Sequence, residues 1–270
     1  MALIPPRNLI SDKIEKARHP QVPRDYLGYS STGGECTRKM WYDLHWAYSR
    51  SIEARVNRIF RRGDYEEGVV HKELKSICIK LTDDQFTVVG PYGHVKGHID
   101  GIVQYVPGYG DEKMLLEIKT MNHKRFIDYR NKGLRETNPG YYSQIMSYMG
   151  KLNLKKCLYI VTNKNDEARD YQIIDYDEDE FNRIESVATG VLFSDKPPEK
   201  IGGKTWMTCK YCDAKQICHY GQAPAKNCRT CEYIAIEEHG KWSCEKTGQN
   251  ISSDEQLTNC KEYELAECLL

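Results

Sequence analysis

One stretch, from Gly97 to Thr120, limits what this 270-residue chain can fold into more than any other. Its first ten residues alternate between apolar and polar side chains, which is typical of a strand with one buried face. A turn rich in proline and glycine follows, and Met114 to Ile118 then form a second apolar run. The stretch therefore predicts a pair of neighbouring strands, against which the remaining elements pack.

Three charged residues lie within this predicted strand pair. Asp100 comes late in the first strand, and Glu117 and Lys119 come late in the second. Because side chains alternate along a strand, Glu117 and Lys119 point to the same face, and Asp100 can join them if the strands are neighbours. Two carboxylates supply the oxygen ligands that Mg²⁺ or Mn²⁺ needs, and a lysine can orient or deprotonate a water for attack on phosphorus. A solvated ion pair is the ordinary alternative for an isolated Glu-x-Lys.

The composition narrows the functional classes. Lysine plus arginine equals aspartate plus glutamate, at 39 each, so any affinity for nucleic acid must come from local patches. No apolar run approaches the roughly 18 residues of a membrane span, and the first ten residues lack the order of a signal peptide. We therefore expect a cytoplasmic protein that does not associate with a membrane. Eleven cysteines in such a chain favour metal or cluster ligation over disulfides.

Residues 49–75 predict a long helix that is the most basic stretch of the chain. Its arginines fit a solvated face and a phosphate-contacting face equally well. His71 follows among apolar residues, where a histidine is more often a core residue than a ligand. An earlier helix, capped by Ser31 or Thr32, is expected to carry Cys36 and Arg38. The polar, basic segment 122–135 is expected to border the site.

Three cysteines late in the chain lie within ten residues of one another: Cys209, Cys212 and Cys218. Three thiolates leave a tetrahedral site or a cubane one ligand short, so a fourth must come from elsewhere. Cys36 is the best candidate for the fourth ligand, and His219 is a weaker one.

A second set of cysteines follows, formed by Cys228, Cys231, Cys244 and Cys260. This pattern predicts a four-thiolate zinc site that holds a small module together, because a segment of this length can scarcely bury a core alone. Unligated thiols are the alternative. The predicted organisation is a lead-in over residues 1–28, a core over 29–222 and a C-terminal four-cysteine module over 223–270.

Seven features of the chain, taken in order, resemble the RecB-type nucleases of the PD-(D/E)xK superfamily. The features are Cys36 with Arg38, Gly63 to His71, Gly97-His-Ile-Asp100, Glu117-Ile-Lys119, Gln144 with Tyr148, and then Cys209-x2-Cys212 and Cys218. The resemblance covers roughly residues 30–220 and is nearer to the branch with an iron–sulfur staple, as in the AddB nuclease domain and the CRISPR-associated adaptation exonucleases. Related proteins are common in bacteriophages.

The resemblance implies a restriction-endonuclease-like α/β core, in which a mixed central sheet is flanked by helices. It implies that His71, Asp100, Glu117 and the carbonyl of Ile118 bind Mn²⁺ or Mg²⁺, and that Lys119 positions the attacking water. It further implies a structural [4Fe–4S] cluster on Cys36, Cys209, Cys212 and Cys218. The residues expected to contact DNA are Gln144, Tyr148, Arg38, Arg58, Arg61 and Arg62.

We therefore expect a metal-dependent DNA nuclease, an exonuclease acting on single-stranded ends, with the exonuclease and single-strand parts resting on family analogy. Partners in recombination, repair, CRISPR adaptation or phage DNA metabolism all remain open. One alternative is a non-catalytic nucleic-acid-binding or assembly module with the same fold. Another is a redox protein that uses the cluster, although no flavin or nicotinamide motif accompanies it.

Overall fold

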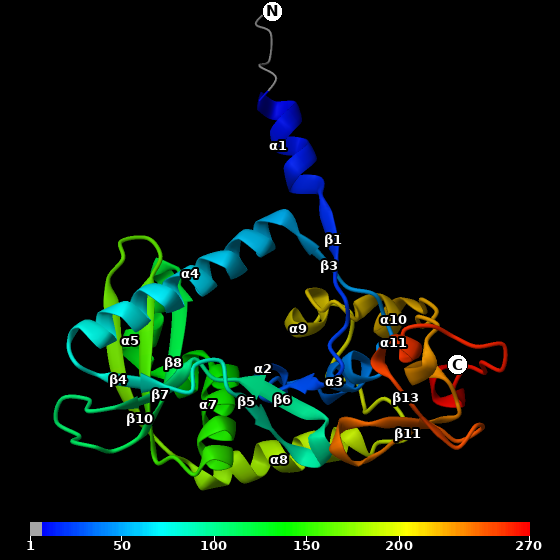
Figure 1. The fold of residues 1–270 in the computed structure, drawn as a ribbon. Coiled ribbons are helices and arrows are strands. Elements are labelled where there is room, and N and C mark those ends of the chain that lie inside the picture. The colour runs from blue at the N-terminus through cyan, green and yellow to red at the C-terminus, as the bar shows by residue number, and fades with distance from the viewer. Residues whose placement is uncertain (1–6) are drawn as a thin grey trace, which may run out of the picture.

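A five-stranded mixed sheet, in the order β10-β9-β8-β7-β4, forms one half of the molecule (Figure 1). The computed structural model describes residues 7–270, so the first six residues of the predicted lead-in lie outside it. Strands β8 and β9 run parallel, and the other neighbouring pairs are antiparallel. The strands are β4 (Lys80–Thr82), β7 (Gly101–Gln104), β8 (Met114–Met121), β9 (Lys156–Asn163) and β10 (Arg169–Asp175).

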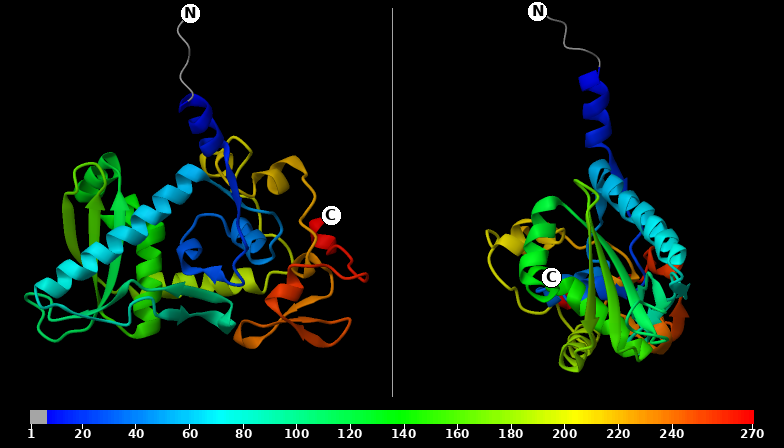
Figure 2. Two further views of the ribbon diagram at one scale, coloured as in Figure 1. Left: turned by 45° about the horizontal axis from the view of Figure 1, so that its top comes forward. Right: turned by 90° about the vertical axis from the view of Figure 1, so that its left-hand side faces the viewer.

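Helices cover both faces of this sheet (Figure 2). On one face, Leu116 of β8 packs in a cluster with Val70 of α4 (Ala54–Ser76). On the other face, Leu115 packs with Met149 of α7 (Pro139–Leu152). Alternate residues of β8 therefore enter two different cores, which is why its sequence reads as a continuous apolar run. The predicted mixed sheet flanked by helices is confirmed, and the restriction-endonuclease-like assignment stays a prediction.

The predicted first strand of the central pair is two strands that belong to different sheets. Strand β6 (Val95–His98) lies in a three-stranded sheet between β2 (Leu27–Gly28) and β5 (Thr87–Val89), and β7 begins at Gly101. Gly101 has φ of 151°, a conformation that side chains with a Cβ rarely adopt. The expectation of one uninterrupted strand was wrong because the chain turns from one sheet into the other at this glycine.

The two predicted helix starts also differ from the structure. The expected cap at Ser31 or Thr32 was wrong: α2 ends at Thr32, and Cys36 caps the next helix by accepting a bond from the Lys39 amide at 3.4 Å. Helix α4 begins at Ala54 rather than near residue 49, because β3 (Ser51–Glu53) pairs with β1 (Arg18–Pro20) instead. The remaining helices before the C-terminal module are α1 (Arg7–Lys16), α2 (Tyr29–Thr32), α3 (Thr37–Leu44), α5 (His123–Lys132), α6 (Leu134–Thr137), α8 (Glu178–Leu192), α9 (Met207–Lys210) and α10 (Lys215–Tyr220), with a 3₁₀ turn η1 (Pro91–Gly93).

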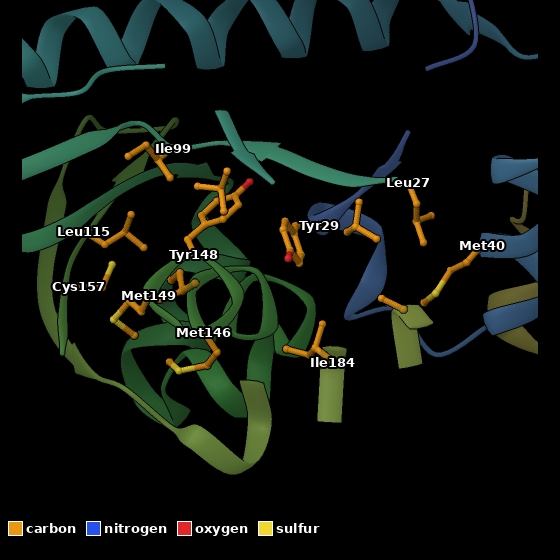
Figure 3. Packing of buried hydrophobic residues seen from close by; sticks show 14 of the residues in the cluster. Leu27, Tyr29, Met40, Ile99, Leu115, Met146, Tyr148, Met149, Cys157 and Ile184 are labelled. Atoms are coloured by element: carbon orange, nitrogen blue, oxygen red, sulfur yellow. The ribbon is translucent and has the colours of Figure 1, made fainter. Parts of the chain in front are cut away.

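A single buried core joins the β6 sheet to the helices. Tyr29 of α2 and Tyr148 of α7 meet edge to face, with ring centroids 5.8 Å apart (Figure 3). Ile184 of α8 lies in the same cluster. None of the helices among the described residues combines the length and the apolar composition that a membrane span requires.

The C-terminal residues form a small antiparallel sheet in the order β11-β12-β13 (Figure 1). Arg229 fastens this module to the core: its buried guanidinium lies 3.7 Å from the ring centroid of Trp46 and 4.5 Å from that of Trp242. It donates to the carbonyls of Leu44 and Asp25, and burial lowers its pKa to about 9. The elements are β11 (Ile234–Ile236), β12 (Trp242–Cys244), β13 (Gln249–Ile251), α11 (Ser253–Gln256) and the 3₁₀ turns η2 (Cys228–Thr230), η3 (Glu238–Gly240) and η4 (Glu267–Leu269).

Candidate functional site

The structure brings Asp100, Glu117 and Lys119 together at one end of the β7–β8 pair. Gly101 pairs with Leu116, so Asp100 and Glu117 occupy neighbouring positions on adjoining strands. Asp100 Oδ2 accepts a hydrogen bond from the Ile118 amide at 2.6 Å. Lys119 Nζ donates to Glu117 Oε1 on the same face of β8, as the period of the strand requires.

The Glu117 carboxylate is buried, and its neighbours compensate its charge only in part. Its side chain is 1% exposed, and its Oε2 has no hydrogen-bond partner among the described residues. Burial raises the pKa of Glu117 to about 7, since the charge of Lys119 lowers it less than burial and Asp100 raise it. When both carboxylates are ionised, the single ammonium leaves one negative charge uncompensated, which a further cation would offset.

Lys119 holds its proton. Burial would lower its pKa, but Glu117 and Asp100 outweigh burial and raise the pKa above its usual range. The ammonium also lies 5.2 Å from the ring centroid of Tyr141. A lysine in this state can orient a water or a phosphate oxygen, and it does not serve as a base.

Gln144 and Tyr148 lie beside the carboxylates but face inward. Gln144 Nε2 donates to the Tyr148 hydroxyl at 2.9 Å, and the two residues are 8% and 2% exposed. Burial raises the pKa of Tyr148, and the negative charge of Glu117 raises it further. The pair therefore supports the site from below, on the α7 side of the sheet, and neither side chain presents a free surface.

His71 approaches the site from the opposite face, on α4. Its Nε2 lies 3.0 Å from the backbone carbonyl of Asp100 and 3.9 Å from Glu67 Oε1. The imidazole therefore touches the main chain of Asp100, not the carboxylates. Across the described part of the chain, no three His, Cys, Asp or Glu side chains are grouped so that they could hold one metal ion.

Two site neighbours were missed from the sequence. Tyr159 pairs with Glu117 in the parallel register of β8 and β9, and its buried hydroxyl has no partner among the described residues. Glu67 lies one helical turn before His71, and burial followed by the charge of Asp100 raises its pKa. The spacing of Glu67 and His71, four residues apart on one helix, was a usable signal. Tyr159 gave no such signal, because its place beside Glu117 depends on the register between β8 and β9.

Three of the four arginines expected to contact DNA are engaged within the protein. Arg58 pairs with Glu15 at 2.7 Å, and Arg62 pairs with Glu167 at 2.6 Å. Arg38 donates to the carbonyls of two prolines, at 3.1 Å to Pro197 and 2.8 Å to Pro198. The fourth, Arg61, is exposed on α4.

Each predicted cysteine set lines a cavity of its own. The first cavity is lined by Cys36, Cys209, Cys212 and Cys218, together with His219. It draws Cys36, at the start of α3, together with three thiols that follow it by more than 170 positions in the chain. Burial raises the pKa of Cys212, and Cys36 nearby raises it further.

The second cavity is lined by the other four thiols, those of Cys228, Cys231, Cys244 and Cys260. Burial raises the pKa of Cys228, and the three companion thiols add to the effect. All eleven cysteines fall within the described residues, and none of them forms a disulfide. Each set of four thiols therefore lies around one cavity.

No protein-family model matches the chain, and no curated protein matches it. Among solved structures, LHK-Exo, an alkaline exonuclease from Laribacter hongkongensis crystallised with dAMP, is similar at 17% identity and a TM-score of 0.48, covering 62% of this chain and 86% of that one. SSO0001 is similar at 17% identity and a TM-score of 0.45, covering 82% of this chain and 97% of that one. A phage-related exonuclease from Haemophilus somnus 129PT is similar at 15% identity and a TM-score of 0.40, covering 57% of this chain and 77% of that one. These similarities are too low to assign a function to this chain.

Proposed function

We propose that this protein is a metal-dependent DNA nuclease that hydrolyses phosphodiester bonds at Asp100, Glu117 and Lys119. The observation that carries the proposal is the buried Glu117 carboxylate beside Asp100, with one oxygen unpartnered among the described residues and a raised pKa. Burying such a group is costly, and proteins retain strongly perturbed acids mainly where they have a task.

The donor set fits a hard divalent cation. Glu117 gives one oxygen to Lys119, and Asp100 gives one to the Ile118 amide, so each carboxylate keeps a second oxygen for a metal. We propose Mg²⁺ or Mn²⁺ on these two carboxylates, with the Ile118 carbonyl and His71 as further ligands. His71 can join only if its Nε2 leaves the Asp100 carbonyl.

The bound ion would supply charge neutralisation at the phosphate and lower the pKa of a water. The protein's own part is positional. Lys119 stays protonated and is held by Glu117 and the Tyr141 ring, so its ammonium is fixed in direction. It would donate to the attacking water or to a phosphate oxygen, where negative charge develops during hydrolysis.

We further propose that the substrate is single-stranded DNA, degraded from its ends. This finer assignment is supported by the sequence resemblance to RecB-type nucleases. A cytoplasmic location is proposed as well, because reduced thiols persist in reducing compartments.

For the first cysteine set we propose a [4Fe–4S] cluster, supported by four thiols that line one cavity. A cubane attaches each thiolate to a different iron atom, so its ligands lie farther apart than those of a single ion. For the second set we propose zinc, which requires its four sulfurs to draw closer together around one ion. Metal analysis of anaerobically purified protein should find about four irons per chain and one zinc.

The test of the nuclease proposal is cleavage of 5′-labelled single-stranded DNA in Mn²⁺, comparing the wild type with Glu117→Gln. We expect cleavage by the wild type and a loss of at least about 100-fold in the variant. Glu112→Gln, in the turn between β7 and β8, is the matched control and should cleave normally. A wild type that binds the strand without cutting it would instead identify a non-catalytic binding module.

A further inference from the structure

A group of basic and aromatic side chains surrounds Tyr26, outside the residues that the proposed chemistry uses. Arg24 Cζ lies 5.9 Å from the centroid of the Tyr26 ring, and Lys96 Nζ lies 5.6 Å from it. The Tyr26 hydroxyl is 3.4 Å from Nε2 of His98. We call Arg24, Tyr26, Lys96 and His98 the Tyr26 cluster.

The cations of this cluster are available for a ligand. In the described part of the chain, neither Arg24 nor Lys96 lies within ion-pair distance of a carboxylate, whereas Arg58 and Arg62 on α4 are paired with glutamates. Both cations lie over the Tyr26 ring, at distances longer than the 3.7 Å that separates Arg229 from the ring centroid of Trp46. Unpaired cations beside an accessible aromatic ring suit the phosphates and bases of a nucleic-acid strand.

Tyr26 and Arg24 also line a cavity, which makes part of the ring accessible from outside. Trp46 and Arg50 line the same cavity from the segment after α3, and Lys226 lines it from the start of the C-terminal module. Its volume of about 230 Å³ is smaller than the 300–1,000 Å³ of sites for drug-sized ligands. A single base with part of its sugar is of the right scale.

The cluster adjoins the proposed catalytic residues along the chain. Lys96 and His98 lie on β6, and His98 precedes Asp100 by two residues, so the Cα atoms of His98 and Asp100 are at most roughly 7 Å apart. On the other side, β2 pairs in parallel with β6, with Leu27 opposite Val95, and this holds Tyr26 beside the strand. Figure 1 shows β6 next to the five-stranded sheet that carries Glu117.

We propose that the Tyr26 cluster and the adjoining cavity bind a segment of single-stranded DNA next to the catalytic carboxylates. Arg24 and Lys96 contact its phosphates, and the Tyr26 ring stacks on an unpaired base that enters the cavity. A base inside a duplex is already stacked on both sides and cannot reach the ring, so the surface selects single strands. The choice of DNA as the ligand rests on the proposed nuclease function.

The proposal is tested by fluorescence polarisation of labelled oligothymidylate and of a blunt duplex, with full-length protein in Ca²⁺ to separate binding from cleavage. Tyr26→Ala should weaken single-strand binding about tenfold, which corresponds to the stacking of one base, and should leave duplex binding within about twofold. Tyr26→Phe keeps the ring and should bind like the wild type. Tyr171→Ala, at an exposed position of β10, is the matched control and should do the same.

Salt dependence tests the phosphate contacts separately. Arg24→Ala and Lys96→Ala should each reduce the slope of log affinity against log salt by about 0.7, the value for one phosphate on a single strand. Lys113→Ala, an exposed lysine in the turn before β8, should leave the slope unchanged.

Equal losses on single strand and duplex in folded Tyr26→Ala, or no loss at all, would overturn the proposal. So would an unchanged slope in both cation variants. Cleavage of the same oligonucleotide in Mn²⁺ separates this proposal from the nuclease function. Binding that depends on Tyr26 without any cleavage would contradict only the proposed nuclease function. Cleavage together with unaltered binding in Tyr26→Ala would contradict only the proposed binding surface.

Discussion

At the scale of single residues, Glu117 ties the proposed chemistry to a measurable pH dependence. Its pKa rises from 4.5 to about 7 on folding, so the folded protein holds this proton more tightly than the unfolded chain does. The resulting stability is present below about pH 4.5 and is lost as the pH rises through about 7. In the metal-free protein, Glu117 should therefore lower the free energy of unfolding by roughly 1–3 kcal/mol between pH 5 and pH 8.

The measurement is denaturant unfolding of the metal-free protein across that range, compared with Glu117→Gln. His45 and His94, whose pKa values burial lowers, change stability in the opposite sense, so the difference between the two proteins is the informative quantity. The decline with pH should be steeper in the wild type. Parallel curves would show that Glu117 does not titrate in this window.

Lys119 gives a second prediction at this scale. Lys119→Ala removes the only ammonium bonded to Glu117 among the described residues, and with it the group that would stabilise charge on the phosphate. Cleavage of single-stranded DNA should fall by about 100-fold to 1,000-fold, the effect of losing one positioned donor. Binding of the same strand in Ca²⁺ should change by less than about threefold. Retained cleavage within about tenfold would assign Lys119 a structural role.

The sequence predicted the position of a side chain where the alternation along a single strand determines which face it occupies. Glu117 and Lys119 share a face because strands alternate, and this could be predicted without a structure. The direction from which His71 arrives could not, because it depends on how α4 lies across the sheet. Tyr159 was missed because its place beside Glu117 follows from the register between β8 and β9, which no local pattern fixes.

At the scale of elements, the first cysteine set links α3 to α9 and α10. Arg38 reinforces the link by donating to the carbonyls of Pro197 and Pro198 in the segment before α9. If this set holds the proposed [4Fe–4S] cluster, Cys212→Ser should reduce iron content and lower the thermal midpoint, because a ligand that joins distant segments is lost. Cys78→Ser is the control, since Cys78 is exposed and lies outside both sets. A Cys212→Ser variant that keeps its iron content and its stability would contradict the proposal that a cluster on these cysteines joins the two segments.

Strand β6 supplies a prediction about packing between elements. A Cβ at Gly97 would overlap the hydroxyl and ring of Tyr148 on α7. Gly97→Ala should destabilise the protein by about 1–3 kcal/mol, since Tyr148 has to move within a packed core. Gly190→Ala in α8 meets open space and should not destabilise the protein. Denaturant unfolding of both variants checks this, and equal stability would contradict the close packing of β6 on α7.

The bounds of strands were predicted well where the apolar pattern ends at a turn, and poorly where the pattern continues from one element into the next. The predicted apolar run from Met114 to Ile118 lies within β8, which begins at Met114 directly after the turn. The alternation from Gly97 onward continues through the break at Gly101, because both halves bury one face. Nothing in that alternation distinguishes one strand from two strands in separate sheets.

At the scale of the whole molecule, the C-terminal module is part of the same packed body as the core. Arg229 lies between two cysteines of the second set and is buried between Trp46 and Trp242. His94, just before β6, also bonds the carbonyl of Glu237 in the module, at 2.7 Å. The four-cysteine module could be recognised from spacing, but its docking could not, because Arg229 carries no local signal of burial.

The central claim is that Asp100 and Glu117 bind a divalent cation. The most direct test is Mn²⁺ binding, followed by electron paramagnetic resonance, in the wild type, Asp100→Asn, Glu117→Gln and the control Glu112→Gln. Either site variant should weaken Mn²⁺ binding at least tenfold, while the control should bind as the wild type does. Equal Mn²⁺ affinity in all four proteins would contradict it.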